Sequence, residues 1–541
     1  MLLRRTLARA ASSSAARTAA LAANQPHPHP PAPPPPAPAP SPSPSPAPAR
    51  KPQPFIPRTT PGARKYQIHS VEAAPAVDPA SASTIISFVE PAAAAPTSST
   101  TAPVRTVTVP NLWLRDASVH PDHVHPSSNQ RLFRTTDIPL TGKLIGYGVH
   151  DLPTHGECLV TEWSKPLDGH TDPTAAKLSV VPTRLLVNLL EHPQHPLEGD
   201  LTLPAPRTWD RSALEETLVR MPYDRFRSDD HALLETLDAL VKDGIVFLTG
   251  VPTTERQGHH TELRRAVERI GSLRRTWYGD LWDVKAVEGS LNIAYTNLDL
   301  GLHMDLTHFD NPPRYQFLHS LQNAGVRGGQ SYFVDTYAVA AHLHSTSPAA
   351  FSTLAHERVH FEYRNGDHHT RFVRPTFELE NGSRTRLHAV NYSPPFQGPL
   401  PLERVSHSST TDRTAVSADA DATRLADLHD ALAQFSHLCD DPTSRFRFEH
   451  QLEPGECVVF DNRRVLHART AFEFERRRPE QQPPAAAEEG QEVREVGRWL
   501  KGAYMDGDEV WSKWRVLSRK SRDAQDEAQQ RRNSRGRTLF V

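Results

Sequence analysis

The chain has 541 residues, of which 37% are hydrophobic, and its formal net charge is -2 with histidines neutral. This balance argues against a general nucleic-acid binder, and the absence of about 18 consecutive apolar residues excludes a membrane-spanning helix. Three cysteines are too few for a disulfide scaffold and fit a reducing compartment. The 29 histidines are many for this length, and histidine is the commonest metal ligand.

The first 103 residues predict a leader followed by a tail without a fold. The start, MLLRRTLARAASSSAARTAALAAN, contains four arginines and many alanines and serines, and the first acidic residue of the chain is Glu72. This composition is typical of a mitochondrial transit peptide, so we expect a mitochondrial matrix location, with the cytoplasm as the alternative. The Pro-rich run that follows favours polyproline II, which buries little surface. Residues 1–103 are therefore interpreted as a transit peptide and a disordered Pro/Ala-rich tail.

From residue 104 the pattern changes to short alternating strands. VRTVTVP and the stretches after it predict a small β-rich domain over residues 104–200, and residues 201–224 are interpreted as a linker. Two segments with helical periodicity follow, one ending at Gly244 and the other at Gly271, where glycine is a natural helix stop.

The second half of the chain has the pattern of a β-rich enzyme domain. Short apolar strands divided by Gly, Pro and Asn predict a β-barrel or jelly roll with helices packed outside, and we assign this domain to residues 225–520. The insert ERRRPEQQPPAAAEEGQ interrupts it and predicts a surface loop. Residues 521–541 are predicted to be a polar tail.

An H-x-D pair in LNIAYTNLDLGLHMDLTHFD is the first candidate for chemistry. His303 and Asp305 alternate along a strand, so both side chains can reach one metal. His467 follows a buried strand in ECVVFDNRRVLHART. Two histidines and one carboxylate occupy one face of an octahedron and leave three positions open, which suits a non-haem Fe(II) oxygenase. On spacing alone, His308 and His319 remain rival ligands.

Five motifs carry a family resemblance: YGDLWDV, AYTNLDLGLHMD, GGQSYFVD, FDNRRVLHAR and GRWLKGAYMDGDEVWSKWRVL. With them the chain resembles the γ-butyrobetaine and trimethyllysine dioxygenases, a branch of the taurine-dioxygenase-like Fe(II)/2-oxoglutarate oxygenases. The resemblance runs from residue 111 to residue 519. It implies a mostly β fold with flanking helices, in which a double-stranded β-helix (jelly-roll) catalytic domain follows a small β-rich domain.

The same resemblance implies the cofactors and the assembly. His303, Asp305 and His467 become the iron ligands and the catalytic centre. The cosubstrates are 2-oxoglutarate and O2, ascorbate is the expected reductant, and the chain is expected to form a homodimer. The substrate is a small quaternary ammonium compound.

The far carboxylate of 2-oxoglutarate needs a fixed cation, and a guanidinium can grip it with two parallel hydrogen bonds. The arginines that follow His467 offer three choices: Arg469, the run Arg476 to Arg478, and Arg498. The resemblance selects Arg498, in GRWLKGAY, and adds Ser331 of GGQSYFVD as a polar contact to the cosubstrate. The arginine run reads as a solvated loop.

The resemblance also implies an aromatic cage for a trimethylammonium group. Such a group has no N–H to donate, so ring faces must attract it. On residue type alone, a hydrophobic core is the preferred interpretation of the same side chains, because Tyr and Trp are often buried. The cage positions are Tyr278, Trp282, Tyr295 and Tyr504.

Two residues bear on the choice of substrate. Asn292 is an amide, which favours the carboxylate of γ-butyrobetaine over the α-ammonium of trimethyllysine, because a buried ammonium needs an acidic partner. Ser393 stands where the butyrobetaine enzyme uses an amide, which leaves room for another betaine. We therefore expect hydroxylation of γ-butyrobetaine to L-carnitine with release of succinate and CO2. The alternatives are trimethyllysine 3-hydroxylation and a non-enzymatic betaine binder, which would not need the iron ligands.

Relatives hold a structural zinc in the small β-domain with three cysteines and one histidine. The matching positions here are Ser118, His120, His123 and His170. Three imidazoles can still bind zinc, but Ser118 cannot supply a thiolate, so the usual four-ligand closure fails. A zinc site and a lost site both remain open on the sequence.

Overall fold

The computed structural model describes most of the chain after residue 65. The described ranges are 66–76, 78–90, 104–152, 155–169, 175–191, 203–258, 260–285, 299–324, 326–402, 418–474 and 497–537. The predicted transit peptide and Pro-rich run lie outside them. So do three of the predicted site residues and the arginine run: His170, Asn292, Tyr295 and Arg476 to Arg478.

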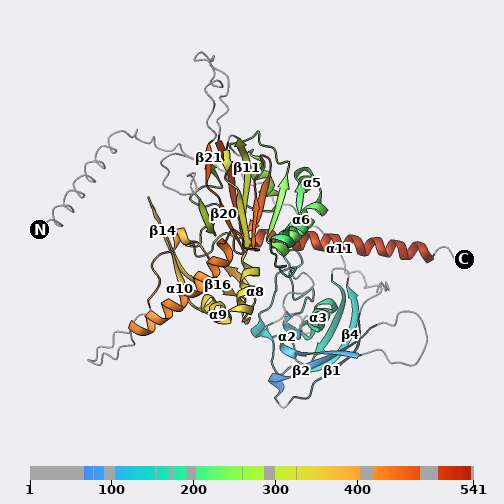
Figure 1. Cartoon of the computed structure of the whole chain (residues 1–541). Coiled ribbons are helices and arrows are strands. Elements are labelled where there is room, and N and C mark those ends of the chain that lie inside the picture. Colours follow the sequence, from blue (N-terminus) through green and yellow to red (C-terminus); the bar gives the residue numbers. More distant parts are fainter. Residues whose placement is uncertain are drawn as a thin grey trace, which may run out of the picture. The chain divides into compact units, whose positions relative to one another are not determined.

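The N-terminal part contains two three-stranded antiparallel sheets. One has the order β1-β2-β3 and the other β4-β5-β6, and helices α2 and α3 contribute to the same core (Figure 1). Phe88 and Trp163 are fully buried in that core. The bounds are β1 (Gln67–Ala73), β2 (Ser83–Val89), β3 (Val104–Pro110), α2 (Asn111–Asp116), β4 (Leu144–Leu152), β5 (Gly156–Trp163), β6 (Leu178–Pro182) and α3 (Thr183–Glu191).

The prediction that no fold begins before residue 104 is wrong. Strands β1 and β2 lie in the predicted tail, and β2 pairs with β3 along its whole length. The run STIISFV is rich in β-branched residues, and Ile86 and Phe88 from it are fully buried. The prediction followed the Pro- and Ala-rich composition around this run and missed the strand. A short apolar run rich in β-branched residues is enough to form a strand, whatever the composition around it.

The C-terminal part contains two larger sheets that share one core. The six-stranded sheet has the order β7-β8-β19-β11-β22-β9, and the four-stranded sheet has the order β10-β20-β13-β18. Phe333 of the smaller sheet packs with Phe247 and Phe460 of the larger one. The bounds are β7 (Arg220–Pro222), β8 (Ile245–Thr249), β9 (Leu281–Lys285), β10 (Leu300–His303), β11 (Tyr315–Ala324), β13 (Ser331–Asp335), β18 (Arg447–His450), β19 (Cys457–Asp461), β20 (Val465–Arg469) and β22 (Gly497–Met505).

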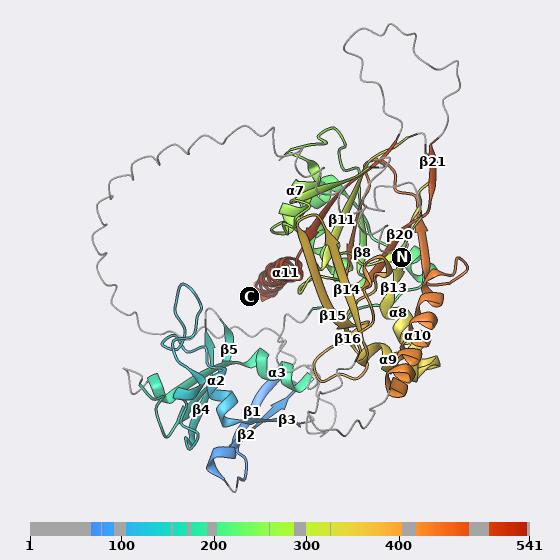
Figure 2. The ribbon, with the colours of Figure 1, turned by 90° about the vertical axis from the view of Figure 1, so that its left-hand side faces the viewer.

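Helices flank both sheets, so the expectation of a mostly β fold with flanking helices is confirmed (Figures 1 and 2). One group packs against the six-stranded sheet: α5 (Tyr223–Ser228), α6 (Asp230–Asp243), α7 (Glu262–Ile270) and α11 (Gly507–Arg537). A second group shares a core with the four-stranded sheet: α8 (Thr336–Thr346), α9 (Pro348–His356) and α10 (Ala418–Asp440). Among the described residues, no helix combines the length and the apolar character needed to cross a bilayer.

Among the described residues, three two-stranded antiparallel sheets complete this part. They are β12 (Val326–Gly328) with β21 (Phe472–Phe474), β14 (Arg358–Asn365) with β15 (His368–Pro375), and β16 (Phe377–Leu379) with β17 (Leu387–Val390). The short 3-10 helix η6 (Pro394–Phe396) follows the last of them. Both predicted helix stops are observed. Helix α6 ends before Gly244, which adopts a left-handed conformation, and α7 ends before Gly271.

Two predicted boundaries need correction. The linker assigned to residues 201–224 contains helix α4 (Arg211–Thr217) and strand β7, which pairs in parallel with β8. The polar tail assigned to residues 521–541 begins inside α11. Short elements such as β7 carry too few residues for a periodic pattern, so only their pairing reveals them.

All three cysteines are buried free thiols in different elements. Cys158 lies in β5, Cys439 in α10 and Cys457 in β19. Burial raises the pKa of Cys158 to about 11 and that of Cys439 well above its usual value.

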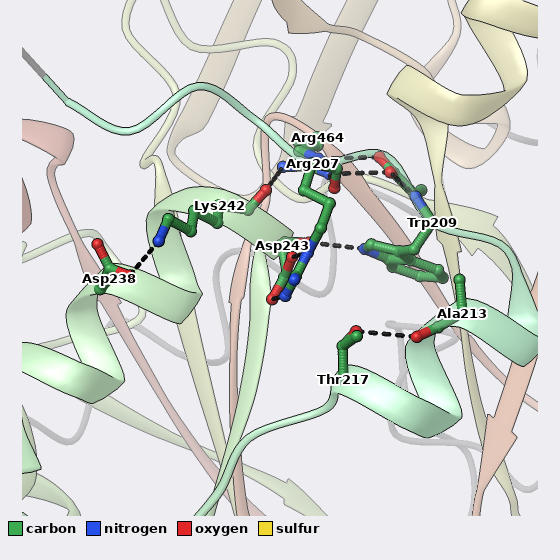
Figure 3. Close-up of polar contacts among 9 residues, drawn as sticks. Arg207, Trp209, Ala213, Thr217, Asp238, Lys242, Asp243 and Arg464 are labelled. Carbon is green, nitrogen blue, oxygen red and sulfur yellow. Dashed lines mark hydrogen bonds and ion pairs between the residues drawn. The ribbon is translucent and has the colours of Figure 1, made fainter.

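A buried ion pair ties the ends of several elements together (Figure 3). Arg464, just before β20, donates from Nε and Nη2 to the two carboxylate oxygens of Asp335, at 2.9 Å each. Its remaining donors reach the carbonyl oxygens of Lys242 at 2.7 Å and Arg207 at 2.6 Å. The backbone N–H groups of Trp209 and Tyr337 also donate to the Asp335 carboxylate, at 3.0 Å and 3.1 Å. This ion pair therefore joins β13, the β19–β20 turn, the end of α6 and the segment before α4.

Replacing Arg464 with methionine is expected to lower the free energy of unfolding by about 3–5 kcal/mol, because it leaves Asp335 buried without its cation. Urea denaturation measures the change. The matched control is Arg327→Met, which breaks an exposed pair with Glu473. That control should cost no more than about 1 kcal/mol. Equal losses in both variants would contradict the role assigned to the Arg464–Asp335 pair.

Candidate active site

Three side chains converge where the end of β10 lies beside β20. His303 and His467 are register partners on these antiparallel strands, and their ring centroids are 4.2 Å apart. Asp305 Oδ1 lies 3.3 Å from His303 Nε2, and Asp305 Oδ2 lies 4.0 Å from His467 Nε2. One ligand atom from each residue lies within 4.8 Å of the others. The structure therefore brings together the three residues that the sequence singled out.

The protonation states of this cluster suit metal binding. His303 Nδ1 donates to the carbonyl oxygen of Gly301 at 2.9 Å, so Nε2 is the ring nitrogen that faces Asp305. Burial lowers the pKa of His467 to about 3, so its ring is neutral. Burial alone would raise the pKa of Asp305, but His303, His467 and the hydroxyl of Tyr504 outweigh burial and hold the pKa well below its usual range. Neutral imidazoles and an ionised carboxylate are the forms that bind metal.

The two rival histidines lie outside this cluster. His308 Nδ1 lies 2.7 Å from Thr370 Oγ1, and its ring stacks with Trp277 and Tyr363. His319 is buried in β11. Burial lowers the pKa of both histidines to about 4, so they are neutral residues of the interior.

A cavity opens on the free side of the three side chains, and both sheets contribute to its wall. Alternate residues of a strand face the same side, so β9, β11 and β22 each present every second residue to it. The six-stranded sheet supplies Trp282, Val284, Gln316, Leu318, Arg498, Leu500 and Tyr504. The four-stranded sheet supplies Leu300, His303, Ser331, His467, Ala468 and Arg469.

One region of the cavity wall is cationic. Arg498 on β22 is only 6% exposed, and burial together with the charge of Arg469 lowers its pKa to about 9. Among the described residues, no carboxylate forms an ion pair with Arg498. Ser331 on β13 is the register partner of Arg469 and lines the same cavity. A buried guanidinium without an acidic partner favours an anionic ligand, and a carboxylate fits its fork geometry.

The other region is aromatic. Trp282 stacks on Tyr504 with ring centroids 3.9 Å apart. Gly502 is the register partner of Trp282, and a Cβ atom there would lie 2.3 Å from the indole, so only glycine leaves room for this stack. Tyr278 also lines the cavity, and burial and a hydrogen bond with Tyr363 raise its pKa. Three of the four predicted cage residues therefore line one cavity with the metal-binding cluster.

Some assignments differ from the expectation or were missed. Ser393 is buried but does not line the cavity; the neighbouring Pro395 and Phe396 do, because η6 turns the chain after Ser393. Tyr504 has a contact that the sequence did not indicate, since its hydroxyl donates to Asp305 Oδ2 at 2.7 Å. Gln316 was missed as a lining residue. Its position becomes visible only once the register of β11 against β22 is known.

The possible zinc ligands in the N-terminal part lie close together. Ser118 Oγ is 3.0 Å from His123 Nδ1, and the rings of His120 and His123 have centroids 5.0 Å apart. The Ser118 hydroxyl also accepts hydrogen bonds from the backbone N–H groups of His120 and Val180. His170 lies outside the described residues, so a zinc site and a lost site both stay open.

The sequence model of the taurine catabolism dioxygenase TauD, TfdA family matches residues 206–481. The chain therefore belongs to this family, and it is a 2-oxoglutarate-dependent dioxygenase, as the motifs predicted. The donor set fits ferrous iron, because two imidazoles and a carboxylate leave one side open toward the cavity.

Among the curated proteins, "Dioxygenase str8" of Strobilurus tenacellus is 36% identical over 407 residues, covering 75% of this chain and 84% of that protein. The γ-butyrobetaine dioxygenase of Pseudomonas sp. (strain AK-1) is 30% identical over 413 residues, covering 76% of this chain and 90% of that protein. A solved structure of asparagine oxygenase with Fe(II), hydroxyasparagine and succinate has a TM-score of 0.35 at 17% identity, covering 52% of this chain and 83% of that one.

Proposed function

We propose that this enzyme hydroxylates γ-butyrobetaine to L-carnitine and converts 2-oxoglutarate and O2 to succinate and CO2. One observation carries the proposal: Tyr278, Trp282 and Tyr504 line the cavity into which the metal-binding cluster opens. Ring faces attract a trimethylammonium group, which has no N–H to donate, by about 2 kcal/mol or more when it is desolvated. The 30%-identical relative named γ-butyrobetaine dioxygenase supports the same substrate.

Each part of the cavity then has a role. His303, Asp305 and His467 would hold Fe(II) on one side, and Arg498 with Ser331 would bind the far carboxylate of 2-oxoglutarate. When bound, the iron with its cosubstrates supplies the oxidation that converts a C–H bond to C–OH. The aromatic residues place the substrate methylene beside the iron and exclude water, which is a proximity effect. We propose ascorbate as the reductant that keeps the iron ferrous.

The two sheets that share a core suit the double-stranded β-helix expected from the family resemblance, and we include this architecture in the proposal. The mitochondrial matrix location is proposed from the composition of the leader, and the homodimer from the family resemblance. Asn292 and Tyr295 complete the proposed substrate site, but they lie outside the described residues.

A second substrate deserves a parallel test. The relative at 36% identity is named only as a dioxygenase, and Ser393 is absent from the cavity wall. Neither observation identifies γ-butyrobetaine, so a second small substrate is tested beside it. Trimethyllysine is the first alternative, because relatives named trimethyllysine dioxygenase are also similar to this chain.

The deciding experiment is succinate release by the iron-loaded enzyme with γ-butyrobetaine, trimethyllysine and taurine in parallel. We expect turnover above background with γ-butyrobetaine and formation of carnitine. Turnover with trimethyllysine alone would move the assignment to that substrate. Turnover with taurine alone would contradict a quaternary ammonium substrate altogether.

Replacing Trp282 with alanine should raise the KM for γ-butyrobetaine by about 10-fold or more, because the loss of one cage wall removes roughly 2 kcal/mol of cation–π attraction. The KM for 2-oxoglutarate should hardly change. Steady-state kinetics with each substrate varied in turn measures both. The control is Trp499→Ala, which removes an indole from the same sheet but outside the cavity wall. Equal changes in both KM values for Trp282→Ala would mean that this residue serves only the core.

A further inference from the structure

The turn between β19 and β20 is unusually well anchored. Its three residues, Asn462, Arg463 and Arg464, are buried, and so is Asp461 at the end of β19. Asp461 pairs with Arg314, Arg463 with Glu378 and Arg464 with Asp335; Figure 3 shows the contacts of Arg464 with the segment before α4 and the end of α6. The turn leads into β20, so its position also fixes the start of the strand that carries His467.

Asn462 uses this anchored turn to hold the backbone of Asp305. The Asp305 N–H donates to Asn462 Oδ1 at 2.8 Å, and Asn462 Nδ2 donates to the Asp305 carbonyl oxygen at 3.0 Å. A second proton of Nδ2 reaches the carbonyl oxygen of Pro313 at 3.2 Å. The Asn462 side chain is completely buried, so water does not compete for these hydrogen bonds.

The next residue shows why such a hold is needed. Leu306 has φ of 59°, in the left-handed region that a residue with a Cβ atom rarely adopts. A residue held in this region costs on the order of 1–3 kcal/mol and persists only where its surroundings enforce it. Leu306 directly follows Asp305, so a relaxed backbone at Leu306 would redirect the peptide that carries the carboxylate.

We propose that Asn462 is a positioning residue for the metal centre. It fixes both backbone polar groups of Asp305, keeps Leu306 in its strained conformation, and so aims the carboxylate at His303 and His467. The same turn leads into β20, so Asp305 and His467 keep one position relative to each other although they are far apart in the sequence. This inference rests on the proposed metal-binding role of the three residues.

Metal titration of the full-length apoprotein tests the proposal without any substrate. Co(II) binding is followed by its visible absorption in the wild type, Asn462→Ala and Asn391→Ala. For Asn462→Ala we expect the Kd for Co(II) to rise about 10–100-fold, the range seen when a group that orients a metal ligand is removed. Asn391 is the matched control, because it is equally buried and donates to Pro375 and Glu378 but not to the metal cluster.

The outcomes separate the two levels of inference. If the wild type binds no Co(II), the proposed function itself fails. If the wild type binds and Asn462→Ala binds as tightly, or if Asn391→Ala is weakened as much, only the role of Asn462 is overturned. If Asn462→Ala does not fold, Asn462→Ser replaces it. A serine hydroxyl keeps at most part of the hydrogen bonds of Asn462, so the same rise in the Kd for Co(II) is expected.

The double variant Asn462→Ala with Leu306→Gly provides a second, independent readout. Glycine adopts positive φ without strain, so the backbone should need less help from Asn462. We therefore expect Asn462→Ala to raise the Kd for Co(II) less in the Leu306→Gly background than in the wild type. Equal penalties in the two backgrounds would overturn the coupling to Leu306.

Discussion

His303→Ala should abolish succinate release that depends on γ-butyrobetaine. Removing a group that merely orients a metal ligand costs about 10–100-fold in activity, so loss of the ligand itself should exceed about 100-fold. The two remaining ligands, Asp305 and His467, no longer close one face around the ion. Succinate release and Co(II) titration of the same protein sample measure the effect on turnover and on metal affinity.

The rival histidines are natural controls for this prediction. His308 and His319 are buried, neutral and outside the metal-binding cluster. Their alanine variants are expected to lose stability but to retain the wild-type Kd for Co(II). Loss of metal binding in either of them, with normal binding in His303→Ala, would contradict the ligand assignment.

Arg498→Met should raise the KM for 2-oxoglutarate by about 10- to 100-fold, because a hydrogen-bonded contact to a charged group is worth about 1.5–3 kcal/mol. The KM for γ-butyrobetaine should change little, since in the proposed function the aromatic residues, not Arg498, hold that substrate. Arg498→Lys should recover only part of the loss, because an ammonium cannot form the two parallel hydrogen bonds. Steady-state kinetics with 2-oxoglutarate varied gives the answer.

A variant of Arg469 tests whether Arg498 is the guanidinium that anchors the far carboxylate of 2-oxoglutarate. Arg469 lines the same cavity and lies near enough to lower the pKa of Arg498. Arg469→Met is expected to raise the KM for 2-oxoglutarate less than Arg498→Met does. The reverse order would make Arg469 the anchor and Arg498 its neighbour.

The metal-binding cluster could be predicted from the sequence to different degrees for its three members. His303 lies on a strand as predicted, but β10 ends at this residue and Asp305 lies two residues beyond it, so strand alternation does not explain the position of the carboxylate. The position of His467 depends on the antiparallel pairing of β10 with β20, which no local pattern encodes. The family motifs supplied that pairing in advance. Gln316 shows the limit of this help, since its place in the wall depends on the register of β11.

The fold could be predicted in outline but not at its edges. Helix ends at Gly244 and Gly271 follow from local chemistry, and both were found as expected. Strand β2 was missed because a Pro-rich composition surrounds a short β-branched run. The buried Arg464–Asp335 pair was also out of reach, because its partners come from distant segments that only the folded topology brings together.

The three buried thiols can serve as internal probes of local opening of the structure. A thiol reagent can modify Cys158, Cys439 or Cys457 only after the surrounding structure opens, because all three are shielded in the native state. Each belongs to a different element, so the order in which they become labelled ranks the local opening of β5, α10 and β19. Labelling followed by peptide mapping would thus measure the rate at which each of the three cysteines becomes accessible, without any engineered probe.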